Sequence, residues 1–95
     1  MARLSWTTEA AATVRDVFAY IARDRPQTAH RTLESILNKV DSLTKYPDLG
    51  QPYRYGPEGV HVLSYGSFKV AYLLEEEGDI LVLGVFHGLV FLPPY

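Results

Sequence analysis

The apolar residues of this sequence change their spacing once, after Tyr46, and this change limits the folds that the chain can adopt. Before Tyr46 they recur at the three- and four-residue intervals of amphipathic helices. After Gly59 they gather in three short runs rich in β-branched and aromatic residues, which is typical of strands. Helices followed by consecutive strands predict an α+β domain in which the helices pack on one sheet.

The helical part divides into two segments around residues 24–27. The first apolar stripe consists of Ala11, Val14, Val17, Phe18 and Ile21, and the second of Ala29, Leu33, Ile36, Leu37, Val40 and Leu43. Thr7 or Thr8 can cap the first helix. Pro26 suits the first position of the second helix, and Asp24 with Gln27 has the spacing of a capping box, so we expect Asp24 to cap it. A link this short predicts an antiparallel helical hairpin.

Three strands are predicted over residues 60–65, 68–74 and 80–86. The breaks at 66–67 and 75–79 have turn chemistry, so consecutive strands should form an antiparallel meander. The segment at 4–6 is also strand-like and would add an edge strand, whereas the prolines and glycines before Gly59 predict a loop. We therefore predict one domain over residues 1–95, with a two-helix hairpin packed on a three- to four-stranded antiparallel β-sheet.

Several function classes are excluded by residue types that the sequence lacks. With no cysteine there is no disulfide and no thiolate nucleophile, as is typical of proteins in a reducing cytoplasm. No apolar run is long enough to span a membrane. His30, His61 and His87 match no metal-ligand spacing, and the glycines match neither common nucleotide-binding pattern. We predict no metal, no cofactor and no membrane insertion.

Charge is distributed unevenly along the chain. Residues 1–50 carry seven Lys and Arg against six Asp and Glu. Residues 51–95 carry two basic residues, Arg54 and Lys69, against five acidic ones. Nucleic-acid-binding surfaces usually cluster basic residues, so the second half does not favour a broad contact with nucleic acid.

Two aromatic and apolar groups are candidates for partner contacts. The tyrosines of the loop and sheet can stack bases, anchor a protein partner or lie half-buried on the sheet, and we retain Tyr53 and Tyr55 as partner-binding candidates. The apolar segment 89–95 can cover the core, extend the sheet, or contact a partner, including a second copy in a homodimer. Its candidate residues are Leu89, Phe91 and Tyr95.

Short motifs occur in a particular order along nearly the whole chain. They are Trp6-Thr7-Thr8-Glu9-Ala10, Tyr20-Ile21-Ala22 with Asp24-Arg25-Pro26, Tyr46-Pro47-Asp48-Leu49-Gly50, Gly59-Val60, Phe68-Lys69-Val70-Ala71-Tyr72 and Val82-Leu83-Gly84-Val85-Phe86-His87-Gly88. This order resembles the RelE/ParE superfamily of toxin–antitoxin toxins, in particular its ParE-like, plasmid-stabilisation branch. The resemblance implies a helical hairpin on an antiparallel sheet, and a small cognate antitoxin that neutralises the toxin. ParE-like members act on DNA gyrase, whereas RelE-like members cleave messenger RNA on the ribosome.

The sequence departs from the family pattern where RNA chemistry would need cations. Members commonly read Gly-Val-Arg-x-Leu, but here His61 stands in place of the arginine, and Leu89-Val90 follow His87-Gly88 where many members are basic. Arginine stabilises a phosphate because it stays charged and presents a planar fork of donors. A weakened site would use His87 as acid or base, His61 and Lys69 on the phosphate, and Tyr72 for positioning. The alternative is that His61 is a sheet residue with one satisfied ring nitrogen, and His87 a strand-end residue bonded to a loop carbonyl.

These departures favour a ParE-like toxin that acts by binding a protein, and is not an enzyme. One alternative is a RelE-like RNA endonuclease. Another is a member that binds its antitoxin but has lost toxicity, which the missing arginines would explain.

Overall fold

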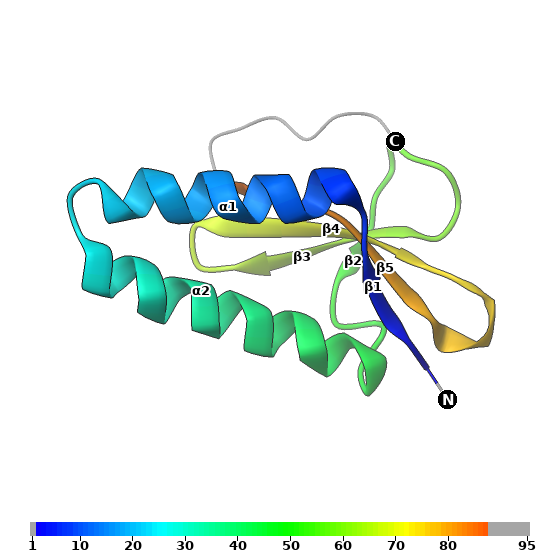
Figure 1. Cartoon of the computed structure of the whole chain (residues 1–95). Coiled ribbons are helices and arrows are strands. Elements are labelled where there is room, and N and C mark those ends of the chain that lie inside the picture. The colour runs from blue at the N-terminus through cyan, green and yellow to red at the C-terminus, as the bar shows by residue number, and fades with distance from the viewer. Residues whose placement is uncertain (1, 88–95) are drawn as a thin grey trace.

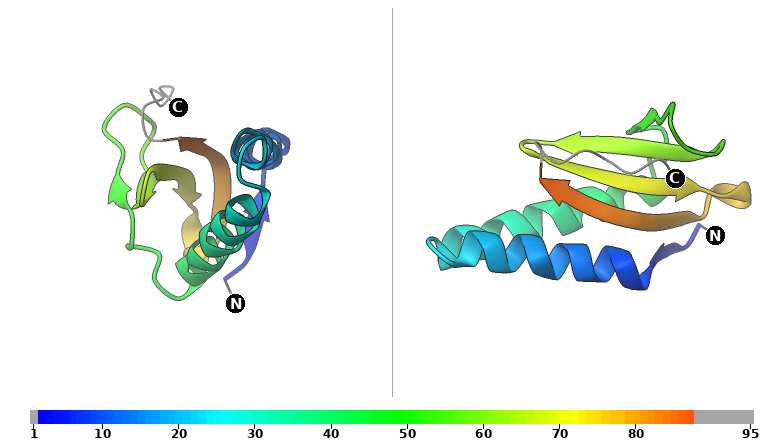
Figure 2. Two further views of the ribbon diagram at one scale, coloured as in Figure 1. Left: turned by 90° about the vertical axis from the view of Figure 1, so that its left-hand side faces the viewer. Right: turned by 90° about the horizontal axis from the view of Figure 1, so that it is seen from above.

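The computed structural model describes residues 2–87 and confirms the predicted α+β architecture (Figure 1). The elements in chain order are β1 (Leu4–Trp6), α1 (Thr8–Ala22), α2 (Pro26–Asp41), a 3-10 turn (Ser42–Thr44), β2 (Gln51–Pro52), β3 (Val60–Tyr65), β4 (Phe68–Leu74), a second 3-10 turn (Glu76–Gly78) and β5 (Ile80–His87). Both helices lie side by side on one face of the sheet (Figures 1 and 2). Within residues 2–87, no helix is long and apolar enough to cross a membrane.

The sheet has five strands in the order β1-β5-β4-β3-β2. The predicted meander β3-β4-β5 is antiparallel, and the predicted edge strand β1 is present. Two features differ from the expectation: β1 runs parallel to β5, and β2 adds a two-residue strand within the segment predicted as a loop. Such a short strand at the sheet edge can contain Pro52, because an edge position does not require its missing N–H.

The two helices begin in different ways. The Thr7 hydroxyl oxygen accepts a hydrogen bond from the N–H of Ala10 at 2.9 Å, so the predicted threonine cap is confirmed. The predicted Asp24 cap is wrong, because α2 begins at Pro26 and its N-cap residue is Arg25, which makes no capping side-chain bond. A residue before proline is disfavoured in helical conformation, so Arg25 stays outside the helix and Asp24 lies one position too far away to cap it.

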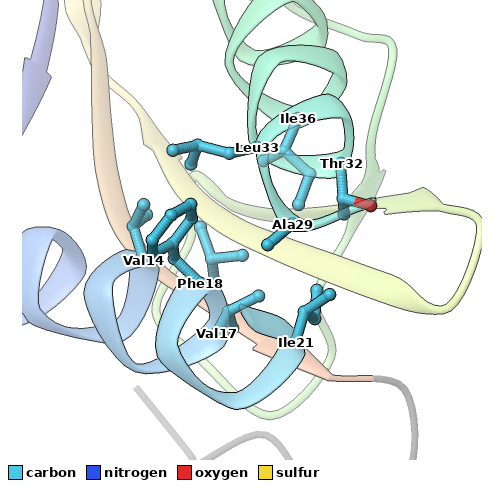
Figure 3. A pocket seen from close by; sticks show the side chains of 9 residues that line it. Val14, Val17, Phe18, Ile21, Ala29, Thr32, Leu33 and Ile36 are labelled. Carbon is cyan, nitrogen blue, oxygen red and sulfur yellow. The ribbon is translucent and has the colours of Figure 1, made fainter. Parts of the chain in front are cut away.

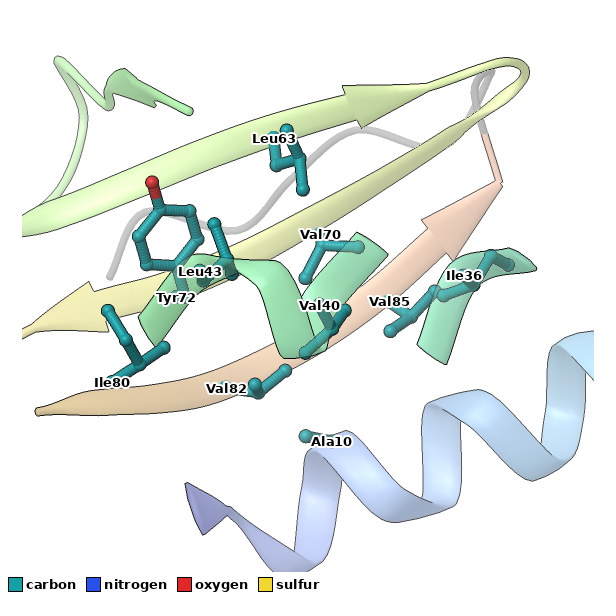
Figure 4. Close-up of a cluster of buried hydrophobic side chains, with 10 residues drawn as sticks. All are labelled: Ala10, Ile36, Val40, Leu43, Leu63, Val70, Tyr72, Ile80, Val82 and Val85. Carbon is teal, nitrogen blue, oxygen red and sulfur yellow. The ribbon is translucent and has the colours of Figure 1, made fainter. Parts of the chain in front are cut away.

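A hydrophobic core fills the space between the sheet and the two helices (Figure 4). Its buried side chains are Ala10, Ile36, Val40, Leu43, Leu63, Val70, Tyr72, Ile80, Val82 and Val85. Val82 and Val85 are three residues apart, so a regular strand would place them on opposite faces. A register shift pairs Tyr72 with Val82 but Ala71 with Gly84, which leaves Leu83 as the extra residue and brings both valines to the helices.

Candidate functional site

The sheet register gives the face on which each of the four predicted catalytic residues lies. His61 is directly opposite Tyr72, and His87 is directly opposite Phe68. Direct partners in an antiparallel ladder share a face, and Tyr72 and Phe68 pack in or against the core. His61, Tyr72 and His87 therefore lie on the helix-facing side. Lys69 follows Phe68 along β4, so it lies on the outer side and does not join them.

Tyr72 is fully buried, and both hydrogen-bonding functions of its hydroxyl are used. The hydroxyl donates to the carbonyl oxygen of Pro47 at 2.7 Å and accepts from the N–H of Gly50 at 3.0 Å. Burial raises the pKa of Tyr72 above its ordinary value of 10.0; the Gly50 N–H opposes this rise, and the charge of Asp48 adds to it. The tyrosine thus ties the loop before β2 to the centre of the sheet.

Gly50 lies so close to Tyr72 that a larger residue does not fit. A Cβ atom on Gly50 would lie 2.8 Å from Cε1 and from the hydroxyl oxygen of Tyr72, and 2.9 Å from the carbonyl carbon of Val62. The motif Tyr46-Pro47-Asp48-Leu49-Gly50 therefore ends in glycine for a packing reason. The loop approaches Tyr72 so closely at this position that no side chain fits.

His61 belongs to the same packed group. Its ring stacks on the Tyr72 ring, with centroids 5.4 Å apart and an interplanar angle of 18°. Its Nδ1 lies 2.9 Å from the carbonyl oxygen of Gly59. A carbonyl only accepts, so the hydrogen bond requires the proton on Nδ1. We call Pro47, Gly50, His61 and Tyr72 the closed end of the helix-facing surface.

His87 lies in a different environment, at the last position of β5. Its ring contacts Phe68 edge-on, with centroids 5.3 Å apart, and lies 6.1 Å from the ring of Tyr20 on α1. Together with Asp16 these residues line a hollow of about 320 Å³ between α1 and the ends of β4 and β5. Within residues 2–87 the His87 ring makes no hydrogen bond. We call Asp16, Tyr20, Phe68 and His87 the open end.

The two ends are too far apart for their residues to act together on one substrate bond. Tyr72 and Phe68 are four residues apart on β4, which is about 13 Å along the strand. His61 and His87 lie on strands to either side of β4, two strand spacings or about 10 Å apart across the sheet. The structure therefore brings His61 and Tyr72 together but separates them from His87 and from Lys69.

Lys69 lines a groove on the outer side of the sheet. Its Nζ lies 3.5 Å from the Ser64 hydroxyl oxygen. The groove, of about 490 Å³, is also lined by Gln51, Tyr53 and Arg54. Both basic residues of the second half of the sequence thus lie along one surface, which we call the outer groove.

The predicted partner-binding tyrosines contact each other, and one of them, Tyr53, lines the outer groove. Tyr53 and Tyr55 meet edge-on with centroids 5.7 Å apart, and the Arg54 guanidinium lies 5.9 Å from the centre of the Tyr55 ring. Tyr55 is 64% exposed. The other three candidates, Leu89, Phe91 and Tyr95, lie outside the described residues.

Sequence reasoning singled out His87 of the open end but missed Asp16, Tyr20 and Phe68 as site residues. Asp16 and Tyr20 are exposed and lie off the apolar stripe of α1. The available signal was their spacing of four residues, which places them on neighbouring turns of one helix face.

The gap between the two helices is not a ligand site. It is lined almost entirely by apolar side chains, among them Val14, Phe18, Leu33 and Ile36 (Figure 3). Its volume of about 10 Å³ holds no more than one water molecule. Within residues 2–87, no group of three or more His, Asp or Glu side chains is arranged to hold a metal ion.

Comparisons with known proteins agree with this architecture. The family described as "ParE toxin of type II toxin-antitoxin system, parDE" matches residues 4–89. The protein named "Putative toxin Y4kP" of Sinorhizobium fredii is 31% identical over 86 residues, which cover 90% of this chain and 88% of that protein.

Two solved structures share the fold. One is titled "Chromosomal ParDE TA system from P. aeruginosa", with a TM-score of 0.79 and 22% identity over 92% of this chain and 96% of that chain. The other is the toxin–antitoxin complex RelBE2 from Mycobacterium tuberculosis, with a TM-score of 0.68 and 21% identity over 90% of this chain and 96% of that chain. The resemblance in the sequence motifs is confirmed, and the chain belongs to the ParE toxin family of type II toxin–antitoxin systems.

Proposed function

We propose that this ParE-family toxin acts in the cytoplasm by binding a protein target, with DNA gyrase as the expected target, and that a cognate antitoxin neutralises it. The observation that carries the proposal is the scatter of the four candidate catalytic side chains. His61 and Tyr72 are hydrogen-bonded to backbone carbonyl oxygens at the closed end. Lys69 lies on the outer side of the sheet, and His87 lies at the opposite end of the helix-facing side.

RNA cleavage would need these groups close together. One group must remove the 2′-hydroxyl proton, another must stabilise the charge on the phosphate, and a third must protonate the leaving oxygen. Proton transfer requires heavy atoms within about 3 Å of each other, or a bridging water. The separation of His61 from His87 is several times larger, so a binding activity suits this chain better than catalysis by these residues.

The antitoxin partner is supported by family membership and by the two structural relatives. The P. aeruginosa structure is described as a ParDE system, and the M. tuberculosis structure as a toxin–antitoxin complex. The open end and the outer groove are two surfaces of residues 2–87 that such a partner could cover.

One observation favours RelE-like RNA cleavage as a second candidate. The outer groove is lined by Arg54, Ser64, Lys69 and Tyr53, and the Tyr55 ring contacts that of Tyr53. Cations that track a phosphate backbone and rings that stack on bases are the usual parts of a single-strand-binding surface. If the protein cleaves RNA, this groove is a better candidate for the site than His61 and His87.

Induced expression, with and without the adjacent reading frame, tests the proposal. We expect growth arrest with DNA breaks and filamentation, intact messenger RNA, and relief when the neighbouring gene is co-expressed. Purified protein should inhibit supercoiling by DNA gyrase. Messenger RNA cleavage with intact DNA would replace the proposal with the second candidate, and unimpaired growth would indicate a member that has lost toxicity.

The substitution His61→Arg tests whether the family arginine alone restores RNA chemistry. Because His61 lies in the closed end, we expect this variant to gain no RNA cleavage in an assay with purified messenger RNA. A gain would show that the helix-facing side of β3 presents a phosphate-binding surface, which contradicts the proposal.

A further inference from the structure

We propose that the open end is a receptor for one cationic side chain, an arginine or lysine, that a protein partner inserts between α1 and the end of the sheet. The partner is the cognate antitoxin, as in the toxin–antitoxin systems of the two structural relatives, and in that respect the inference rests on the proposed function. It adds the chemistry of one contact, which neither the fold nor the family relatives specify.

The aromatic rings of the open end form the walls of the hollow. The rings of Phe68 and His87 meet at 78°, so they make a corner, and the Tyr20 ring is tilted by 49° to that of His87. Tyr20 is 65% exposed although it is a large aromatic residue. Cations bind over ring faces within about 6 Å of the centroid.

Asp16 gives this hollow its preference for positive charge. It lies one helical turn before Tyr20 and lines the same space. Within residues 2–87 its carboxylate makes no hydrogen bond or ion pair, and no lysine or arginine lines the hollow. A cation that enters would therefore meet aromatic rings together with a carboxylate that has no ion-pair partner within residues 2–87. A neutral ligand would gain nothing from the carboxylate charge.

The charge distribution of the sheet supports the same occupant. Both basic residues of the second half, Arg54 and Lys69, line the outer groove on the far side. The open end lies on the helix-facing side, where neither residue can repel an incoming cation at short range.

Among residues 2–87, no strand covers the hollow from the side of the sheet. Strand β1 pairs with β5 only as far as Val82, so the rest of β5 has no neighbouring strand on that side within residues 2–87. The N–H of Val85 instead donates to the Thr13 hydroxyl oxygen of α1 at 2.9 Å. Beyond this bond the space opens beside His87, and its volume of about 320 Å³ is large enough to admit one long side chain.

A nuclear magnetic resonance titration of the full chain tests the proposal. The probes are N-acetyl-arginine N-methylamide and the matching citrulline derivative, which has nearly the same shape but no charge. We expect the arginine probe to shift the ring protons of Tyr20, Phe68 and His87, with a dissociation constant in the millimolar range. The citrulline probe should bind about fivefold more weakly.

Two exposed substitutions and two matched controls localise the binding. Asp16→Asn and Tyr20→Ala should each weaken the arginine probe by about threefold to fivefold. The controls are Asp24→Asn, an exposed acid in the turn between the helices, and Tyr55→Ala, a tyrosine of nearly equal exposure. Both controls should leave the titration unchanged.

Equal shifts with both probes, or shifts centred elsewhere, would overturn the proposal. So would an unchanged affinity in Asp16→Asn. The titration requires neither toxicity nor an antitoxin, so its outcome is separate from the growth experiment. Charge-dependent binding with unimpaired growth would remove the proposed function and leave the receptor in place.

Discussion

The closed and open ends each pair a histidine from the helix-facing side of the sheet with a tyrosine, yet the surroundings of the two pairs differ. At the closed end a histidine stacks on a buried tyrosine, and backbone atoms occupy the tyrosine hydroxyl and one nitrogen of the histidine ring. At the open end a histidine meets two rings beside a carboxylate, and no described residue hydrogen-bonds its ring. A histidine–tyrosine pair is thus a structural unit where neighbouring atoms satisfy it, and a candidate binding site where they do not.

The largest effect should come from adding one methyl group at the closed end. We expect Gly50→Ala to lower the free energy of unfolding by about 3 kcal/mol, because the methyl group meets both Tyr72 and the backbone of Val62. Urea unfolding measures the change. The control is Gly66→Ala. No atom of residues 2–87 lies within 4 Å of the new methyl group, and only the positive φ of 57° destabilises the variant, by about 1 kcal/mol. Equal losses in the two variants would show that the closed end is not tightly packed.

Removing the Tyr72 hydroxyl should have the next largest effect. Tyr72→Phe leaves the N–H of Gly50 and the carbonyl of Pro47 without their partner, so we expect a loss of about 2 kcal/mol in urea unfolding. Tyr65→Phe is the control, because the Tyr65 hydroxyl makes no hydrogen bond within residues 2–87, and it should change stability by less than about 0.5 kcal/mol. A loss of similar size in both variants would mean that the loop bonds contribute nothing specific.

Alkaline pH should weaken the closed end through the same hydroxyl. Burial raises the pKa of folded Tyr72 above 10.0, so the unfolded chain releases this proton at a lower pH than the folded chain does. The contribution is present below about pH 10 and is lost as pH rises through the folded pKa. Urea midpoints between pH 7 and 11 should therefore fall more steeply for the wild-type protein than for Tyr72→Phe. Parallel curves would show that Tyr72 ionises equally easily in both states.

The smallest effect on stability is expected at the open end. Tyr20→Ala should change the free energy of unfolding by less than about 0.5 kcal/mol, since most of the ring is exposed. Thermal unfolding followed by circular dichroism checks this. A loss approaching that of Tyr72→Phe would make Tyr20 a structural residue and would remove the contrast between the two ends.

The sequence predicted well what depends on local pattern. The two helices, the meander and the edge strand follow from spacing, turn residues and Thr7. The parallel direction of β1 and the pairing of β2 were not predictable, because they depend on how distant segments return to the sheet. The Asp24 cap failed because the restriction before Pro26 outweighed the spacing of the capping box.

Some residues of the two ends could be singled out from the sequence, but which of them lie together in the fold could not. Alternation along β4 separates Lys69 from Tyr72, whereas the extra residue Leu83 on β5 changes which of its side chains reach the core. Tyr72 could be singled out from the sequence, but its hydroxyl partners belong to a loop more than 20 residues away. Asp16 and Tyr20 become part of the open end only because α1 packs against the end of β5. No local sequence pattern encodes this packing.

The bond between Thr13 and Val85 has a consequence for how molecules of this protein meet one another. The Thr13 hydroxyl accepts a hydrogen bond from the Val85 N–H and donates one to the carbonyl oxygen of Ala10. This side chain therefore links α1 to β5 and satisfies an N–H that a neighbouring strand would otherwise bind. An unfilled backbone N–H on an outer strand invites another chain to add its own strand, which is the first step of aggregation. Thr13 therefore makes the Val85 N–H unavailable to a strand of a second molecule.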